Sequence, residues 1–546
     1  MPPLSRPFAD ALTDLRRGWL ALRTRGPGQA RFWLIALATG LVAGYAAVAF
    51  RLAISAIQTF LYGADDATLA TTLASAPWYL VVAIPVLGGL AVGLLLQRFT
   101  ADGKVHSVAN VIEGAALRDG RVERRAGLAS ALASLITLST GGSTGREGPV
   151  VHLGAVISSW VSDRIGADGL TARDLMGCAA AAAVAASFNA PIAGALFALE
   201  VVLRHFALHA IAPIMVAAVA GAVVSRLHIG NVPEFHLPVN QLEFYVELPA
   251  FMLLGLLSGL VAAILTRSVM LAEGVADTVT KALAIPRWVR PGVSGFLLGL
   301  LALGFPHIIG VGYETTSSAL LGEFGFWTAV VLTATKVLAV ALTFGGRMGG
   351  GIFSPSLMVG ALTGLAFGHV ATALMPGVSG TEALYALAGT GAVAAGVLGA
   401  PLSTTMIVFE LTGDWQTGVA VMVSVSLASA LASRLMTRSF FLTQLARQKK
   451  PVALGAQDYI CSTLSLIPFT RPLTPEDAVR VEALVADGRT VEERETLDHA
   501  LTLFHGGAVP VLAVLREGRP VALLHEADAL RAFSAALVKA AREEHS

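Results

Sequence analysis

The sequence predicts an all-α polytopic membrane protein, and three observations carry that prediction. Of its 546 residues, 55% are hydrophobic and only 14% are charged, and the mean hydropathy is +0.70. A water-soluble domain cannot hide so many apolar side chains in its core. Long apolar stretches recur along the chain, and two of the glycine-rich segments that interrupt them are alike.

The apolar stretches differ in length. A helix needs ~20 apolar residues to cross a bilayer, and several stretches are shorter, so we expect some helices to stop partway through the membrane. The stretches lie at about residues 32–55, 78–97, 126–140, 148–163, 175–203, 208–225, 248–272, 292–311, 326–345, 352–374, 383–411 and 418–436.

Positive charge flanks the apolar region at both ends. Arginines crowd the first 31 residues, and Arg438, Arg447, Lys449 and Lys450 follow the last apolar stretch. The positive-inside rule then places both termini in the cytoplasm, with an even number of crossings of the cell (inner) membrane and residues 1–30 as a cytoplasmic segment. We expect no cleaved leader. The net charge of +1 argues against a nucleic-acid partner.

Two halves of the membrane region repeat one pattern. In each half a glycine-rich break is followed by Ala-Pro and then by Phe and Glu. The distance from Glu147 to Glu200 is 53 positions and that from Phe353 to Glu410 is 57. Such breaks can kink ordinary packed helices. Their recurrence in the same order instead favours discontinuous helices around a site in the middle of the membrane. The breaks are residues 141–149 and 349–355.

Glu147 lies inside the first break, between segments apolar enough for a bilayer. A charge at that depth costs at least ~3 kcal/mol and therefore indicates a functional site. Gly145 and Gly148 allow a tight turn before a helix that includes Pro149, and free N–H groups at a helix N-terminus attract anions. Glu147 would compete with an anion for that position, and protonation or displacement would open the path. The alternative is a surface carboxylate in a loop.

The segment Gly141–Gly145 also matches the G-x-S-x-G nucleophile elbow, with His152 nearby. An elbow needs a strand before it and a helix after it, whereas residues 129–140 have a helical pattern. We therefore expect no enzyme activity and no cofactor. Cys178 and Cys461 fit no metal-ligand spacing and are interpreted as packing residues.

These motifs resemble the CLC family of chloride channels and proton-coupled chloride transporters over about residues 32–447. The resemblance implies an inverted repeat that spans the lipid bilayer at residues 31–447. It also implies a homodimer with one pore per subunit, and chloride as the transported ion. The matching motifs are Gly-Arg-Glu-Gly-Pro at 145–149, Phe-Asn-Ala-Pro at 188–191, Gly-Gly-Ile-Phe-Ser-Pro at 350–355 and Phe-Glu-Leu-Thr-Gly at 409–413.

The resemblance also implies roles for single residues. Glu147 is the external gating glutamate, and the backbone N–H groups of Ile352 and Phe353 line the central anion site. His106 falls where the family has an anion-coordinating serine, with a histidine packed at a helix end as the alternative. Phe441 replaces a tyrosine, so that hydroxyl bond to the anion is lost. The candidate anion-binding residues are His106, Ser107, Gly145, Arg146, Gly148, Gly351, Ile352, Phe353 and Phe441.

Proton-coupled members of the family commonly have a second glutamate directly after the position of Glu200, where this chain has Val201. Valine carries no proton, which favours a glutamate-gated, voltage- or pH-sensitive chloride channel. Chloride/proton exchange is the alternative, with Glu200 or water carrying the proton. A transport-inactive sensor or scaffold is a more distant alternative, motivated by His106 and Phe441.

Residues 448–546 are more polar and predict a small cytoplasmic α/β domain. We expect a helix over 496–504, strands over 508–514 and 521–524, and a helix from Asp528, in a β-α-β-β-α order. This tail resembles half of a CBS-domain pair. A single half lacks its usual partner for an adenine nucleotide, so we expect a folded spacer at the dimer interface rather than a nucleotide site.

Overall fold

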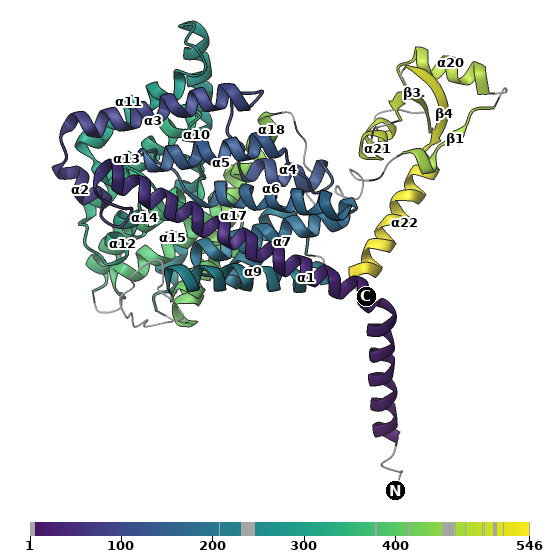
Figure 1. The fold of residues 1–546 in the computed structure, drawn as a ribbon, viewed down its shortest axis with the longest axis horizontal. Coiled ribbons are helices and arrows are strands. Elements are labelled where there is room, and N and C mark those ends of the chain that lie inside the picture. The colour runs from purple at the N-terminus through teal and green to yellow at the C-terminus, as the bar shows by residue number, and fades with distance from the viewer. Residues whose placement is uncertain are drawn as a thin grey trace.

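A computed structural model of the chain shows a large helical bundle and a small domain near the C-terminus that contains a sheet (Figure 1). It describes residues 6–206, 208–230, 246–376, 379–412, 415–448, 450, 464, 466–474, 477–493, 495, 497–505, 510–516 and 518–544.

Every regular element in the described part of residues 6–450 is a helix. The helices are α1 (Arg6–Tyr62), α2 (Leu69–Ser75), α3 (Trp78–Phe99), α4 (Val108–Leu117), α5 (Arg124–Ser139), α6 (Glu147–Ile165), α7 (Gly169–Phe188), α8 (Pro191–Phe197), the π-helical η1 (Ala198–Leu203), α9 (Leu208–Ile229), α10 (Leu248–Ala282), α11 (Arg290–Gly304), the 3-10 turn η2 (Pro306–Ile308), α12 (Tyr313–Leu320), α13 (Phe326–Gly345), α14 (Phe353–Leu374), α15 (Glu382–Leu398), α16 (Pro401–Thr412), α17 (Trp415–Leu435) and α18 (Phe440–Arg447).

Seven helices in the described part of the chain are long and apolar enough to cross a membrane. Others are too short, because a span needs ~20 residues: α4 has 10 residues, α8 has 7 and α12 has 8. The mixture agrees with the prediction that some helices stop partway. The seven segments are Ala30–Tyr62, Trp78–Phe99, His209–Ile229, Leu248–Ala282, Phe326–Gly345, Phe353–Leu374 and Thr417–Arg447.

Two of the predicted apolar stretches are each divided into separate helices. Residues 175–203 form α7, α8 and η1, and residues 383–411 form α15 and α16. The breaks have one cause. Asn189 and Gly399 are left-handed, with φ of 57° and 68°, and each is followed by Ala-Pro, with the proline opening the next helix. A left-handed residue ends a helix and a proline starts one, so the matching Ala-Pro pairs of the repeat mark helix boundaries.

The two halves cap each other's helices. Glu200 accepts hydrogen bonds from the backbone N–H groups of Leu402 (3.0 Å) and Ser403 (2.8 Å) at the start of α16. Glu410 accepts them from Ile192 (3.0 Å) and Ala193 (2.7 Å) at the start of α8. These exchanged contacts are those of two halves related by a two-fold axis, and they support the predicted repeat.

Small residues allow the close packing of the centre of the bundle. The run from Ala179 to Ala183 on α7 is completely buried, and α7 packs against α1, α6 and α9. Small side chains let helix backbones approach closely, which is the usual means of association in a membrane. Cys178 directly precedes this run and is also buried, as predicted for a packing residue. Cys461 lies outside the described residues.

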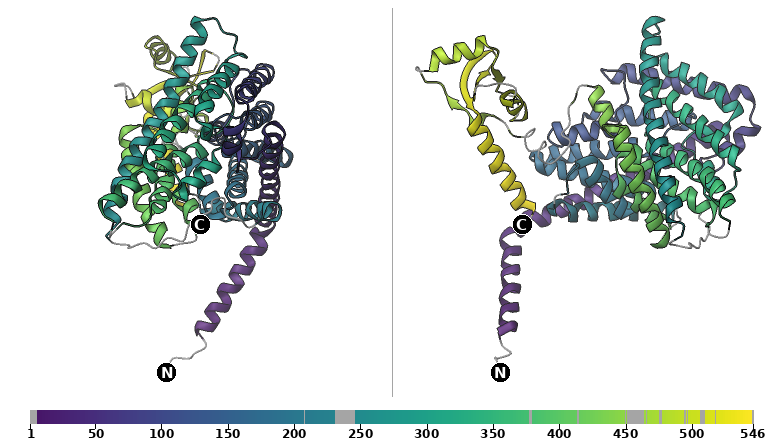
Figure 2. Two further views of the ribbon diagram at one scale, coloured as in Figure 1. Left: turned by 90° about the vertical axis from the view of Figure 1, so that its left-hand side faces the viewer. Right: turned by 180° about the vertical axis from the view of Figure 1, so that it is seen from behind.

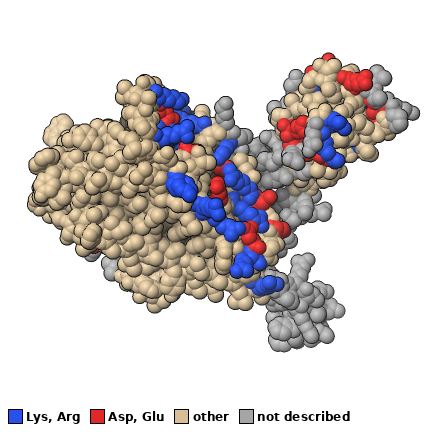
Figure 3. Space-filling model, turned by 45° about the horizontal axis from the view of Figure 1, so that its top comes forward, with Lys and Arg blue, Asp and Glu red and all other residues tan. Residues whose placement is uncertain are grey.

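Charged side chains gather on one side of the bundle. Figure 3 shows a broad uncharged surface and a band of Lys, Arg, Asp and Glu on the side from which the C-terminal domain extends. We call this the tail side. An uncharged belt with charge at its edge is the surface expected of a protein that lies in a bilayer.

The C-terminal domain stands apart from most of the bundle (Figure 2) and contains a four-stranded sheet of order β1-β4-β3-β2. β2 pairs with β3 in parallel, and the other pairs are antiparallel. The expected β-α-β-β-α order is confirmed by β2, α21, β3, β4 and α22. The elements are η3 (Ile467–Phe469), β1 (Arg471–Pro472), α20 (Ala478–Ala486), β2 (Thr490–Glu492), α21 (Leu497–His505), β3 (Val511–Arg516), β4 (Arg519–His525) and α22 (Glu526–Glu544).

Candidate anion-binding site and gate

The two glycine-rich breaks meet in the interior of the bundle. The N–H of Gly145 donates to the carbonyl of Gly351 at 2.7 Å, and the N–H of Gly351 donates to the carbonyl of Gly145 at 2.7 Å. The pair forms an isolated antiparallel bridge between loops more than 200 residues apart in the sequence. The predicted meeting of the two breaks is therefore observed.

The two loops match residue for residue. α6 begins at Glu147 and α14 begins at Phe353, and Pro149 and Pro355 are the third residues of their helices. First-turn N–H groups have no partner within their own helix and carry partial positive charge. Two such helix ends at one bridged contact form an environment suited to a single anion.

Gly145 and Gly351 have a different role from the one expected. Their amide groups bond to each other, so neither N–H is available to an anion. The structure assigns them to the bridge, while the amides of Ile352 and Phe353 at the start of α14 remain candidate anion donors. The backbones also approach closely, since a Cβ on Gly351 would lie 2.9 Å from the nitrogen of Gly148. A side chain at either position would push the loops apart.

Glu147 is buried, with 3% of its surface exposed. Its Oε1 accepts a hydrogen bond from the Ser354 hydroxyl at 2.6 Å and another from the Tyr313 hydroxyl at 3.2 Å. Oε2 is buried without a hydrogen-bond partner among the described residues. Because Ser354 is the second residue of α14, the carboxylate lies against the N-terminus of the helix in the opposite half. This is a place where a bound anion would compete with it.

Arg146 lies next to the gate candidate and is also buried. Its guanidinium carbon stands 4.6 Å from the centre of the Tyr313 ring, and its Nη2 donates to the carbonyl of Ser187 at 3.4 Å. A cation over an aromatic face is attracted by the ring. Arg146 thus positions Tyr313, which in turn donates to Glu147. Sequence reasoning missed both Tyr313 and the hydroxyl of Ser354.

A cavity of about 150 Å³ reaches toward the bridged loops and is lined by Ser107 and Gly350. Four cationic side chains line it against two carboxylates, a balance that attracts anions. Ser107 is the N-cap residue of α4, and its N–H donates to Asn110 Oδ1 at 3.1 Å. The charged lining residues are Lys104, Arg290, Arg347 and Arg447 with Glu273 and Asp277.

The structure does not bring His106 together with the bridged loops. Its ring lines a second cavity, of about 210 Å³, and stands 5.8 Å from the ring of His152. Ser107, one residue later, lines the cation-rich cavity instead. Since the two residues face different cavities, Ser107 is better placed than His106 for the serine role that the resemblance implied.

Phe441 lies in α18 and is buried. Gln444 and Gln448 follow it on the same helix face at i+3 and i+7 and line the cation-rich cavity. The neighbouring Phe440 packs against Phe344, another lining residue, with ring centres 5.7 Å apart. Phe441 contacts Phe440 in turn, with ring centres 5.7 Å apart, so the two rings pack behind residues that line this cavity.

Glu200 and Val201 offer no obvious site for a mobile proton. Both carboxylate oxygens of Glu200 accept hydrogen bonds from the start of α16, and Val201 is buried. Glu200 serves as a helix cap. The segment before Gly141 is the helix α5, not a strand, so the geometry of a nucleophile elbow is not formed there.

Comparison with known proteins identifies relatives that match most of the chain. The family model described as voltage gated chloride channel matches residues 88–433. A putative chloride channel protein ClcB-like of Ralstonia nicotianae is 30% identical over 415 residues, which are 75% of this chain and 95% of that protein. The voltage-gated ClC-type chloride channel ClcB of an Escherichia coli strain is 30% identical over 425 residues, 76% of this chain and 98% of that protein.

Solved structures share the fold. A slow cyanobacterial Cl⁻/H⁺ antiporter has a TM-score of 0.66 at 22% identity, covering 77% of this chain and 98% of its own. A eukaryotic CLC transporter has a TM-score of 0.67 at 19% identity, covering 91% of this chain and 98% of its own.

Fold and site together define a multi-pass membrane protein built around two opposed, interrupted helices. The chain belongs to the CLC family of voltage gated chloride channels.

Proposed function

We propose that the chain moves chloride across the membrane past the bridged loops, and that Glu147 is the gate. The observation that carries the proposal is the hydrogen bond of 2.6 Å from Ser354 to Glu147, which holds a carboxylate on the N-terminus of α14. Relatives named as chloride channels support chloride as the ion. Transport by this path needs no covalent step and no cofactor.

The proposed path begins in the cation-rich cavity. Chloride enters among its arginines, passes Ser107 and Gly350, and reaches the first-turn amides of α6 and α14. Partial charges at helix ends hold an ion less tightly than full charges do, which permits exit as well as entry. Fluoride and nitrate are the competing ions to measure beside chloride.

Gating follows because Glu147 and chloride compete for one position at the N-terminus of α14. Ionised Glu147 occupies the end of α14 and excludes a second negative charge. Protonation removes its charge, or chloride displaces it, and the path opens. Acidification should therefore raise chloride flux.

The test is chloride efflux from vesicles containing the purified protein. The substitution Glu147→Gln keeps the shape and removes the charge, so we expect flux to rise several-fold and to lose its dependence on pH. Glu323→Gln, at an exposed loop carboxylate, is the matched control and should behave as wild type. An unchanged pH response in Glu147→Gln would refute the gate. Background flux in both wild type and Glu147→Gln would instead support the sensor or scaffold.

Passive conduction is the first candidate mode, supported by the capped Glu200 and the buried Val201. Exchange of chloride for protons is the second, favoured by two neighbouring histidines in the cavity beside α6. Reversal potentials with chloride and proton gradients varied independently discriminate the two. A potential that follows chloride alone identifies conduction, and a shift with the proton gradient identifies exchange.

We infer that the protein is a homodimer with one pore per subunit. Large apolar side chains are exposed on α8, α9, α16 and α17, the elements around the reciprocal glutamate caps. Lipid or a second copy would cover them. Light scattering in detergent should give a protein mass of twice 56.4 kDa. The exposed side chains include Ile192, Met215, Val219, Leu402 and Met422.

We also propose that both termini and the tail side face the cytoplasm of a cell or inner membrane, and that residues 448–546 are half of a CBS-domain pair acting as a spacer at the dimer interface. The charged band on the tail side supports the orientation. Proteolysis of a C-terminal tag in sealed vesicles of known sidedness tests it. Protection in inside-out vesicles would overturn the orientation.

A further inference from the structure

A second polar cavity, of about 210 Å³, lies on the tail side near α6 and plays no part in the proposed anion path. It has room for several water molecules, because one water molecule needs about 10–15 Å³. Two histidines stand in its wall among charged groups of both signs. The polar lining residues are Asp102, His106, Asn110, Glu113, Arg118, Arg121, Glu123, His152 and Lys450.

His152 is the unexplained group in this wall. It is 1% exposed, and neither ring nitrogen has a hydrogen-bond partner among the described residues. A buried imidazole without partners is costly, and water in a polar cavity of this size is the natural partner. The ring of His106 stands 5.8 Å from it, tilted by 55°. Two imidazoles so close, with water, can pass a proton between them.

Charged groups face His106 from each neighbouring element. Asp102 comes from the loop before α4, Glu113 from α4, Glu123 from the start of α5 and Lys450 from the chain after α18. The carboxylates raise the pKa of His106 and Lys450 lowers it, but burial has the largest effect and the net pKa is lowered. His106 therefore holds a proton only briefly at neutral pH. Brief occupancy suits a group that relays protons rather than storing them.

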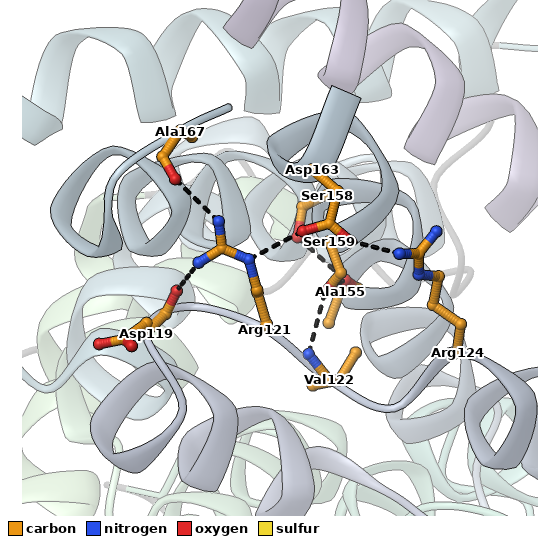
Figure 4. Close-up of polar contacts among 9 residues, drawn as sticks. All are labelled: Asp119, Arg121, Val122, Arg124, Ala155, Ser158, Ser159, Asp163 and Ala167. Atoms are coloured by element: carbon orange, nitrogen blue, oxygen red, sulfur yellow. Dashed lines mark hydrogen bonds and ion pairs between the residues drawn. The ribbon is translucent and has the colours of Figure 1, made fainter. Parts of the chain in front are cut away.

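The loop between α4 and α5, which lines the cavity, is anchored to the end of α6. Arg121 and Arg124 both form ion pairs with Asp163, Arg121 also donates to the carbonyl of Ala167 at 2.8 Å, and the N–H of Val122 donates to Ser159 at 3.0 Å (Figure 4). These contacts fasten the loop between α4 and α5 to the last turns of α6. α6 consequently runs from the gate to the cavity.

His152 lies between these two ends of α6, five residues after Glu147. Five residues correspond to ~7.5 Å along a helix axis and to a turn of about 140° around it, so a chain of hydrogen-bonded water molecules has to join the two side chains. Val201 cannot carry a proton, and Glu200 is engaged as a cap. Protons for Glu147 from the tail side therefore need another route.

We propose that His106 and His152 form the tail-side proton entry to the Glu147 gate. A proton passes from cavity water to His106, from His106 to His152 and then through water to the carboxylate, which becomes neutral and releases its hold on α14. His106 and His152 each return to the neutral form after the transfer. The proposal rests on Glu147 being the gate, and it applies to conduction and exchange alike.

The experiment is current recording from excised inside-out patches, in which bath pH sets pH on the tail side and pipette pH sets it on the other. Wild type should pass more current as either side is acidified, by up to about tenfold per pH unit, the limit for one proton. His152→Gln should lose the response to bath pH and keep the response to pipette pH. His106→Gln should also lose the response to bath pH. Because His106 is less buried and lies outside the helices, this variant still tests the proposal if His152→Gln does not fold.

Two further variants separate the possible failures. His228→Gln alters a histidine on α9 whose ring bonds to the carbonyl of Val224, and it should keep both responses. Glu147→Gln should lose both, and if it keeps them the gate itself is refuted. If Glu147→Gln loses both responses while the two cavity variants retain the bath response, only the histidine route is overturned. Wild-type current that does not change with bath pH would also overturn the histidine route.

Discussion

The two interrupted loops share one backbone design, and only the first carries a carboxylate. Each runs Gly-x-x-x-Pro into a helix, and Gly145 and Gly351 bond to each other across the bridge. The first loop carries Glu147, and the matching residue of the second is Phe353. The Phe353 ring packs against Phe188 and Phe197, with ring centres 5.0 and 6.1 Å away. A symmetric backbone scaffold thus supports the asymmetric gate that we propose.

With Glu147 as the proposed gate, the difference explains how a repeat can provide one. One half contributes a charged side chain and the other contributes the place it occupies, the N-terminus of α14. A second carboxylate in the opposite loop would put two like charges at one bridged contact, and one would have to stay protonated. With a single carboxylate, a chloride ion can replace it with no change in net charge.

The largest effect should come from breaking the bridge between Gly145 and Gly351. Gly351→Ala places a Cβ 2.9 Å from the nitrogen of Gly148, so the bridge must open and both helix ends must shift. We expect chloride flux to fall to the vesicle background. Gly274→Ala, on α10 where an added Cβ meets nothing within 4 Å, is the control. Normal flux in Gly351→Ala would show that the bridge is dispensable.

Removing the hydroxyl that holds the gate should have the next largest effect. Ser354→Ala deletes the shorter hydrogen bond to Glu147, and a hydrogen bond to a charged group contributes ~1.5–3 kcal/mol. We expect flux at neutral pH to rise by about tenfold or more, as the carboxylate leaves α14 more readily. Combining Ser354→Ala with Glu147→Gln should add little. Fully additive effects in the double variant would mean that Ser354 acts elsewhere.

Tyr313→Phe should act in the same direction and more weakly, because the bond from Tyr313 to Glu147 is 3.2 Å against 2.6 Å from Ser354. The ring remains for Arg146 to pack on. We expect a rise of about two- to fivefold, corresponding to ~0.5–1 kcal/mol. A fall in flux would place Tyr313 in the path rather than behind the gate.

The smallest effects should come from the two caps. Glu200→Gln and Glu410→Gln each weaken bonds to a helix N-terminus, for which about 1 kcal/mol is typical. If the caps are symmetric, both variants should lower the midpoint of thermal unfolding by a similar few degrees and leave flux per folded protein unchanged. A loss of pH response in Glu200→Gln alone would restore Glu200 as a proton carrier.

Much of the fold could be predicted from composition and pattern. The apolar stretches located most of the bundle, and the sequence of the tail predicted the segments of α21, β3, β4 and α22 but named none for β2. The breaks at Asn189 and Gly399 were missed because largely apolar sequence continues on both sides of each. The Ala-Pro pair that followed each break was recognised as part of the repeat but not as a helix start.

The site was predicted in part. Glu147 and the meeting of the two loops followed from a charge and glycines in apolar surroundings. Tyr313 was missed because it lies 166 residues from Glu147 in no shared motif. His106 and Ser107 face different cavities because of the direction in which the chain turns into α4. The sequence pattern does not predict that direction.

The sequence by itself determined that this chain lives in a membrane, repeats one design twice and buries a glutamate between helices, because hydrophobicity, glycine and proline act locally. Tertiary structure decided which atoms bond across the halves. It turned two glycine amides toward each other, placed Ser354 under the carboxylate and left His152 facing a polar cavity. Those outcomes arise from the packing of distant segments, where a shift of an ångström makes or breaks a hydrogen bond.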